Sequence, residues 1–213
     1  MCDSASSRRR IARAARAAGA SAVGGRAAVF LDRDGTLHRE LERAPRSFDE
    51  LEFFPSVAPA LRALSAAGLP LVVVTNQSAV ASGEVSVAEL DALHAQLARR
   101  LPITAAYACP HHPERGLPPY ARACTCRKPR SGLLERACAE HELDPHRSWI
   151  VGDARRDLEA GLALGARAIL VLTGKGEREL AGLDGALRAR ISVARDLGEA
   201  SAQILAGHAA QGR

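Results

Sequence analysis

Two aspartates one residue apart follow an apolar run and precede a glycine. Asp32 directly follows the apolar run Ala27–Leu31, and after Arg33 the chain continues with Asp34 and Gly35. A buried strand that ends in this way places both carboxylates at the carboxyl edge of a sheet, where open α/β proteins bind ligands. One carboxylate can be a nucleophile while the other transfers protons, and two close carboxylates favour Mg²⁺. The alternative is an ordinary polar turn, since Asp and Gly are common in turns.

A hydroxyl and two amides follow a second apolar run. The run Leu71–Thr75 ends in a threonine, and the chain continues with Asn76, Gln77 and Ser78. At a strand end these side chains can donate hydrogen bonds to phosphate oxygens. The alternative makes Thr75 a strand former and Ser78 a helix cap.

Two later features add charge of both signs. Arg127 and Lys128 precede Pro129, which restricts the backbone of the residue before it. A lysine held there can neutralise phosphate, although a solvated basic turn is the alternative. Another apolar run ends at Asp153, and Asp157 lies on the same face of the following helix. We expect Asp153 to bind a metal with Asp157 behind it, whereas the alternative is a helix cap. Together the four strand ends predict a Mg²⁺-dependent phosphate site.

Three thiols and an imidazole lie in one Pro-rich segment, residues 109–126. Such a set suits a closed tetrahedral zinc site, which would staple a loop that has little core of its own. Free cysteines in a loop are the alternative. His112 is the weaker histidine candidate, and Cys2 and Cys138 lie outside the pattern. The expected zinc ligands are Cys109, His111, Cys124 and Cys126.

The elements that must position these residues alternate between short β-branched runs and longer helical patterns. This alternation predicts a doubly wound, mostly parallel Rossmann-like α/β sheet with helices on both faces. Residues 38–55 and 109–130 interrupt it, and they leave room for a small insertion and a zinc loop but no large cap domain. The expected strands are Ala27–Leu31, Leu71–Thr75, Ile103–Ala108, Trp149–Gly152, Ala168–Leu172 and Ile191–Val193. The expected helices are Val57–Ala67, Val87–Arg100, Gly132–Glu142, Arg155–Leu164, Glu177–Leu187 and Leu197–Leu205.

Composition limits the class of protein. The chain has 213 residues and a formal charge of +5, and a length of this order suits one α/β domain. Six arginines lie in residues 1–26, whereas basic and acidic residues balance from Ala27 onward. We therefore expect a disordered tail at 1–26, a catalytic domain at 27–206, a short tail at 207–213 and no nucleic-acid surface. No apolar run reaches the ~20 residues of a membrane span. The odd cysteine count is unlike a secreted framework, so a cytoplasmic monomer is expected.

The order of these motifs resembles the haloacid dehalogenase superfamily of phosphohydrolases over about residues 27–195. The resemblance implies that Asp32 is the nucleophile and Asp34 the general acid and base. It also implies that Thr75 and Lys128 bind the transferring phosphoryl group. The Asp32 carboxylate, the Asp34 carbonyl and Asp153 would hold Mg²⁺.

The zinc loop is similar to that of one branch, the D-glycero-D-manno-heptose 1,7-bisphosphate 7-phosphatases. Twelve residues separate His111 from Cys124, and Ser78 follows Gln77; both features favour this branch over the related histidinol-phosphate phosphatases. The resemblance implies a sugar phosphate cleaved at C7, with Arg127 in contact with the substrate. The alternatives are histidinol phosphate, a polynucleotide 3′-phosphate, or a zinc-ribbon module that binds nucleic acid without catalysis. The chain departs from the branch at three positions, Ala79, Ser82 and Ala154.

Overall fold

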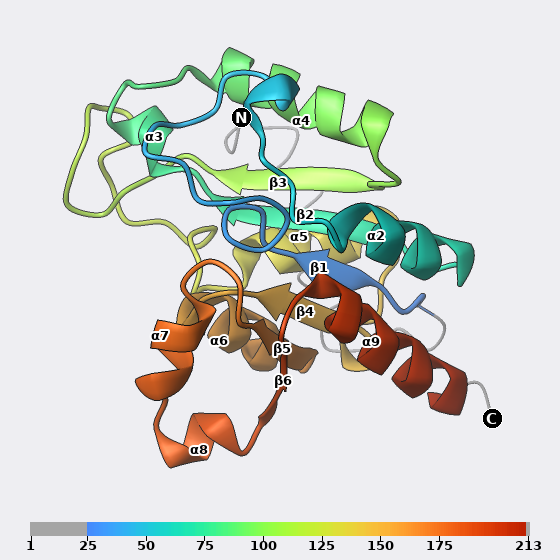
Figure 1. Ribbon diagram of the computed structural model, residues 1–213. Coiled ribbons are helices and arrows are strands. Elements are labelled where there is room, and N and C mark those ends of the chain that lie inside the picture. Colours follow the sequence, from blue (N-terminus) through green and yellow to red (C-terminus); the bar gives the residue numbers. More distant parts are fainter. Residues whose placement is uncertain (1–24, 212–213) are drawn as a thin grey trace.

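A computed structural model describes residues 25–211, which form one parallel six-stranded sheet between helices (Figure 1). The strand order is β3-β2-β1-β4-β5-β6, and every neighbouring pair is parallel. The predicted doubly wound sheet is confirmed. The strands are β1 Val29–Leu31, β2 Leu71–Asn76, β3 Ala105–Cys109, β4 Trp149–Gly152, β5 Arg167–Val171 and β6 Ile191–Ala194. All six expected strands are present, with ends that shift by one or two residues.

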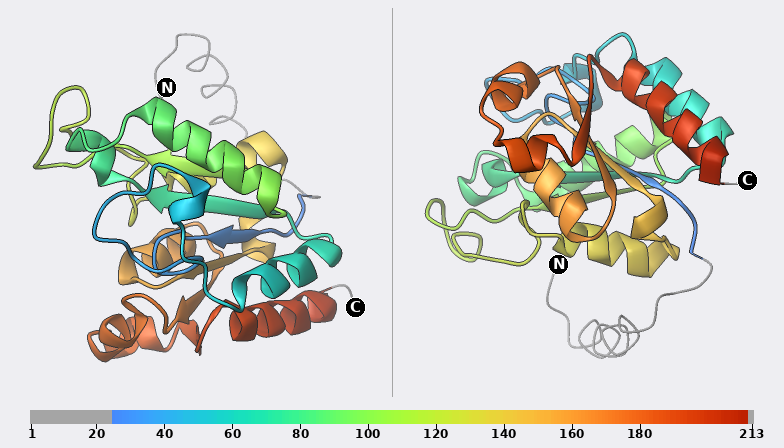
Figure 2. Two further views of the ribbon diagram at one scale, coloured as in Figure 1. Left: turned by 45° about the horizontal axis from the view of Figure 1, so that its top comes forward. Right: turned by 90° about the horizontal axis from the view of Figure 1, so that it is seen from below.

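Two layers of helices cover the two faces of the sheet. The helices are α2 Val57–Ala66, α3 Ser78–Ala81, α4 Val87–Arg100, α5 Gly132–His141, α6 Arg155–Ala163, α7 Gly176–Ala181, α8 Gly185–Arg188 and α9 Leu197–Gln211, with 3-10 turns η1 Phe48–Glu50 and η2 Pro145–Arg147. Helices α2 and α9 lie side by side on one face, and α5 and α6 lie on the other (Figure 2). Side chains alternate along each strand, so β1 gives Val29 and Leu31 to the first layer and Phe30 to the second.

Two predicted helix boundaries are wrong. The single helix expected over Glu177–Leu187 is two short helices, because Gly182 ends α7 and the carboxylate of Asp184 caps α8 by accepting from Leu187 N. The last helix does not end at Leu205 but continues to Gln211. Residues 207–211, expected to be a tail, are therefore helical, and the His208 ring lies edge-on to Trp149.

The arginine-rich segment, residues 1–26, can be compared with the prediction only at its end. The arginine-rich segment expected to be disordered lies mostly outside the described residues. Its last residue, Arg26, already belongs to the fold, since its N donates to Glu142 O and its O accepts from Asp144 N. None of the helices within residues 25–211 is long and apolar enough to cross a membrane.

The connections that follow β1, β2, β3 and β4 meet at the carboxyl edge of the sheet. In Figure 1 the arrowheads of these strands point to the side where the loop between β3 and α5 extends. Strand β1 is central, between β2 and β4, so residues that follow it are flanked by residues from both neighbours. This arrangement positions the charged side chains described next.

Candidate active site

A buried ion pair joins the end of β1 to the loop before α5. Lys128 Nζ lies 2.8 Å from Asp32 Oδ1 and 2.6 Å from Asp157 Oδ1, and it donates to Val74 O at 2.6 Å. All three charged side chains are buried. Burial alone would lower the pKa of Lys128, but the charges of Asp157 and Asp32 raise it. Lys128 therefore stays a cation whose position is fixed on three sides.

Asp153, which follows β4, is a carboxylate in need of a counter-charge. Its Oδ2 accepts from Lys175 N at 2.9 Å, while its buried Oδ1 has no hydrogen-bond partner within residues 25–211. Burial, and next the charge of Asp32, raises the pKa of Asp153 to about 7. Asp32, Asp153 and Asp157 each offer an oxygen within 4.8 Å of one another. Such an oxygen set, with an unpaired buried atom, fits Mg²⁺.

Gly35 is required beside this carboxylate group. Its φ of +81° lies in the left-handed region, and a Cβ there would lie 2.1 Å from Asp153 Oδ2. Gly174 approaches from the loop after β5 in the same way, since its Cβ would lie 2.2 Å from the same oxygen. Two glycines from different loops thus let backbone close around Asp153.

Asp34 is held on both carboxylate oxygens. Its Oδ1 accepts from Arg33 Nη2 at 2.9 Å and lies 3.4 Å from His38 Nε2. Its Oδ2 accepts from Gln77 Nε2 at 2.6 Å and from Thr75 Oγ1 at 3.3 Å. Burial raises the pKa of Asp34, but the charges of Arg33 and His38 together with these hydrogen bonds lower it to about 2. The side chain keeps 27% exposure, so it can reach a bound group.

The polar side chains at and after the end of β2 make hydrogen bonds both to Asp34 and to the loop that carries Arg127 and Lys128. Asn76 donates from Nδ2 to Lys128 O at 3.1 Å and accepts at Oδ1 from Lys128 N at 3.0 Å. Its side chain therefore fixes the lysine loop, although we expected it to bind phosphate. Gln77 bonds Thr75 as well as Asp34. Ser78 Oγ accepts from Arg127 Nη1 at 3.0 Å.

The three thiols and the imidazole of the β3–α5 loop converge on one point. The sulfur atoms lie 3.3 to 3.5 Å apart, and His111 Nδ1 lies 3.4 Å from Cys126 Sγ and 3.7 Å from Cys109 Sγ. In a tetrahedral site with Zn–S bonds of ~2.3 Å, neighbouring sulfurs are ~3.8 Å apart. The thiol of Cys109, and next burial, raises the pKa of Cys126. Crowded thiols of this kind fit a cation that would favour their thiolate forms.

The neighbouring histidine and the remaining thiol take no part in this cluster. His112 Nδ1 accepts from the backbone N of Glu114 and Arg115 at 3.2 and 3.1 Å, so its ring shapes the loop. Cys138 is a free thiol on α5. The choice of His111 over His112 agrees with this geometry.

A cavity of about 260 Å³ is lined by Asp32 and Asp34. Its walls come from the ends of β1 and β2, from segment 40–45 and from the loops after β3 and β5. They include Asp32, Arg33, Asp34, Glu40, Leu41, Arg43, Ala44, Pro45, Thr75, Asn76, Gln77, Ser78, Ala79, Arg127, Arg156 and Lys175. The expected phosphate-binding side chains after β2 and Arg127 thus share one cavity with Asp32 and Asp34, whereas Lys128 and Asp153 are buried and do not line it.

Sequence reasoning missed two buried partners of this site. Arg33, the middle residue of Asp-x-Asp, is 1% exposed, and its Nη1 lies 3.3 Å from Nε2 of buried His94 on α4. Burial, and next the charge of Arg33, lowers the pKa of His94 to about 3. A signal for His94 existed, because it falls in the apolar stripe of α4 between Leu90 and Leu97. Arg33 carries no such signal, since arginine at a strand end is ordinarily solvated.

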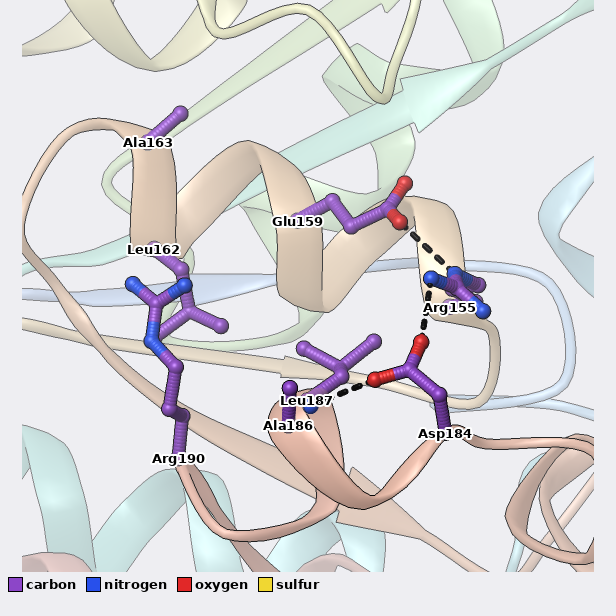
Figure 3. Close-up of a pocket in the computed structure, with 8 residues that line it drawn as sticks. All are labelled: Arg155, Glu159, Leu162, Ala163, Asp184, Ala186, Leu187 and Arg190. Atoms are coloured by element: carbon purple, nitrogen blue, oxygen red, sulfur yellow. Dashed lines mark hydrogen bonds and ion pairs between the residues drawn. The ribbon is translucent and has the colours of Figure 1, made fainter.

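A second cavity, of about 350 Å³, lies between α6 and α8 and is separate from this site (Figure 3). Its polar side chains are largely paired with one another, as Arg155 bonds both Glu159 and Asp184. None of the strand-end residues described above lines it. This cavity is therefore not the candidate active site.

Comparison with known proteins agrees with the class that the fold and site define. Residues 125–200 match a family model described as HAD-hydrolase-like, that is, of the haloacid dehalogenase class. The parallel sheet, with carboxylates directly after β1 and β4, is the architecture expected for this class of hydrolase.

Relatives narrow the class to one family. The chain is 40% identical to D-glycero-beta-D-manno-heptose-1,7-bisphosphate 7-phosphatase of Pseudomonas putida over 71% of its own length and 86% of that protein. It is 36% identical to the enzyme of the same name from Escherichia coli K12 over 70% and 80% of the two chains. A crystal structure of D,D-heptose 1,7-bisphosphate phosphatase from B. bronchiseptica, complexed with magnesium and phosphate, superposes with a TM-score of 0.71 at 32% identity, covering 84% of this chain and 98% of that one. The chain belongs to this family of HAD-like phosphatases.

Proposed function

We propose that this protein removes the C7 phosphate of D-glycero-D-manno-heptose 1,7-bisphosphate. The observation that carries the proposal is the fixed Lys128 ammonium 2.8 Å from the Asp32 carboxylate, because Asp32 lines a cavity that is also lined by five further cations. That arrangement suits a phosphorylated substrate that is itself strongly anionic. The names of the relatives support the heptose bisphosphate.

Asp32 is the nucleophile in this proposal, and Asp34 moves the proton. An Asp32 oxygen forms a bond to phosphorus while the bond from phosphorus to the C7 oxygen breaks. With its pKa at about 2, Asp34 is ionised in the free protein, so it must take up a proton from solvent when the substrate binds, and it gives that proton to the departing oxygen. It then takes a proton from water, which attacks phosphorus and releases inorganic phosphate from Asp32. The hydrogen bonds from Arg33 and Gln77 hold Asp34 in place between these two steps.

Lys128 and Thr75 serve the phosphoryl group. Lys128 is fixed by Asp157 and Val74 O, and its charge offsets the charge on the equatorial oxygens. Asp32, the carbonyl of Asp34 and Asp153 would hold Mg²⁺, with Asp157 behind them. When bound, Mg²⁺ would neutralise phosphate charge and orient the group for attack.

The cluster of Cys109, His111, Cys124 and Cys126 would hold structural zinc. Its support is the convergence of four ligand atoms within 4.8 Å of one another. Burial, and next the charge of Arg122, lowers the pKa of His111, which keeps the imidazole in the neutral form that binds metals.

We also propose a cytoplasmic monomer that acts on a small sugar phosphate. All cysteines within residues 25–211 are free, which suits a reducing compartment. Leu117 is the single exposed large hydrophobic residue in that range, at 63%, so the described surface offers little for a stable apolar interface. The balanced charge from Ala27 onward argues against a nucleic-acid substrate.

A phosphate-release screen tests the substrate. Wild-type protein with Mg²⁺ is assayed on heptose 1,7-bisphosphate, histidinol phosphate and a 3′-phosphorylated oligonucleotide. The heptose bisphosphate should give the highest kcat/KM, with phosphate released from C7 as seen by ³¹P NMR. Faster hydrolysis of histidinol phosphate would replace the substrate while leaving the phosphatase chemistry in place.

A further inference from the structure

Five cations line the catalytic cavity, and three of them already have partners. Arg33 is bonded to Asp34 and lies against His94. Another, Arg127, donates to Ser78 and His111 O, and the third, Lys175, is paired with Glu40. The two that remain are Arg43 and Arg156. Within residues 25–211, neither of these two makes a hydrogen bond or an ion pair at its guanidinium group.

Arg156 faces carboxylates that oppose its charge. It stands in the first turn of α6, directly before Asp157. Burial would lower its pKa, but the charges of Asp157, Asp32 and Asp153 raise it. Its charge therefore balances the buried acidic group. Arg43, in contrast, is exposed on the segment between β1 and α2 and has no such balance.

The backbone on both sides of Arg43 is anchored, although its side chain is free. Ala44 N donates to Glu84 Oε1 at 2.7 Å, and Arg46 Nη2 donates to Glu84 O at 3.1 Å. Pro45 is buried, and on the other side the ion pair of Glu40 with Lys175 ties the segment to the loop after β5. A guanidinium held over a cavity in this way loses little backbone freedom on binding an anion.

We propose that Arg43 binds the second, non-transferring phosphate of the sugar bisphosphate. The inference rests on the proposed function, and it deepens it by naming a residue that selects bisphosphates over monophosphates. In the proposed function the transferring phosphate lies at Asp32, with Lys128 and Thr75, so the distal dianion must contact other residues of the cavity. Arg43 lines the same cavity and has no partner for its charge among residues 25–211, and its planar fork matches phosphate oxygens.

The test compares two substrates that differ only in the distal group. Steady-state kinetics of the full chain are measured on heptose 1,7-bisphosphate and heptose 7-phosphate for wild type, Arg43→Ala and Arg43→Lys. Arg39→Ala is the matched control, because Arg39 is an exposed arginine four residues away that neither lines the cavity nor anchors the backbone beside Arg43. Arg43→Ala should lower the ratio of kcat/KM for bisphosphate over monophosphate by about tenfold, mainly through KM. Arg43→Lys should recover part of that ratio, and Arg39→Ala should keep the wild-type ratio.

The outcomes separate the inference from the function on which it rests. An unchanged ratio in Arg43→Ala, or an equal fall in Arg39→Ala, would overturn the role of Arg43 while the bisphosphatase activity stands. If wild type does not hydrolyse the bisphosphate at all, the proposed function fails first. Thermal unfolding of each variant, expected to match wild type, excludes loss of the fold as the cause.

Discussion

The backbone carbonyl of His111 accepts a hydrogen bond from Arg127 Nη1 at 3.0 Å, and the same nitrogen donates to Ser78 Oγ at 3.0 Å. One guanidinium thus connects a residue of the thiol cluster to the residue that begins α3 at the end of β2. These two hydrogen bonds hold the Arg127 side chain between the loop that joins β3 to α5 and the end of β2. We therefore expect changes in the loop to affect any contact that Arg127 makes with substrate.

Loss of one thiol should disturb both metal content and substrate binding. Purified wild type should contain close to one zinc per chain by elemental analysis. Cys124→Ser should lose that zinc, raise KM and increase proteolysis within residues 109–126, because structural zinc supplies folding free energy. Cys138→Ser is the control, since this thiol lies outside the cluster. Zinc-free wild type that is active and stable in chelator, once Mg²⁺ is restored, would refute the assignment.

Replacement of Arg127 should cost selectivity rather than chemistry. Arg127→Ala should lower kcat/KM for heptose 1,7-bisphosphate roughly ten- to a hundredfold more than for an aryl phosphate, because a charge-assisted hydrogen bond of about 1.5–3 kcal/mol is lost. Arg130→Ala removes a nearby exposed cation and should change neither value much. Equal losses on both substrates would instead give Arg127 a role in the chemistry or in the loop alone.

The two aspartates of the β1 turn should fail in different ways. Asp32→Asn should reduce turnover more than a hundredfold on every substrate, a barrier increase above ~2.7 kcal/mol, with an unchanged circular dichroism spectrum. Asp34→Asn should lose roughly 10²–10⁴-fold on the sugar phosphate, because proton transfer to the leaving oxygen is lost. Its loss should be smaller on an aryl phosphate, whose leaving group needs less protonation. Asp34→Asn with identical losses on both would argue against its role as acid.

His94 should make the fold sensitive to acid. Its pKa is about 3 in the folded protein, below its ordinary value of 6.5, so the unfolded chain binds a proton that the folded chain does not. The titration of His94 therefore leaves the free energy of unfolding unchanged above about pH 6.5 and lowers it as pH decreases toward 3. His94→Gln keeps an acceptor for Arg33 but removes the titration.

Denaturant unfolding at several pH values measures this effect. Between about pH 6 and pH 4, the free energy of unfolding should fall less steeply in His94→Gln than in wild type, by up to ~1.4 kcal/mol per pH unit. His146→Gln, at an exposed histidine, should follow wild type. Coincident curves for all three proteins would show that His94 does not set the acid limit.

The sequence alone was sufficient for the sheet and for the strand ends that carry charge. Apolar β-branched runs separated by helical patterns have few other ways to bury their surface, and such runs end where polar residues begin. Asp32, Thr75 and Asp153 are therefore readable as residues of one edge. The grouping of the three thiols and the imidazole is readable for the same local reason, because Cys109 and His111, like Cys124 and Cys126, are near neighbours in the chain.

Contacts between distant segments decided the rest. The pairing of Lys128 with Asp157, the use of Asn76 to fix the lysine loop, and the burial of Arg33 against His94 join residues from separate elements. No local pattern encodes such pairs, because the sequence shows what a side chain can do but not which partner lies within reach. The same limit applies to Glu177–Leu187, where packing and the Asp184 cap divide a continuous helical pattern into two helices. Tertiary structure alone settles these choices, since only the folded chain brings the competing partners together.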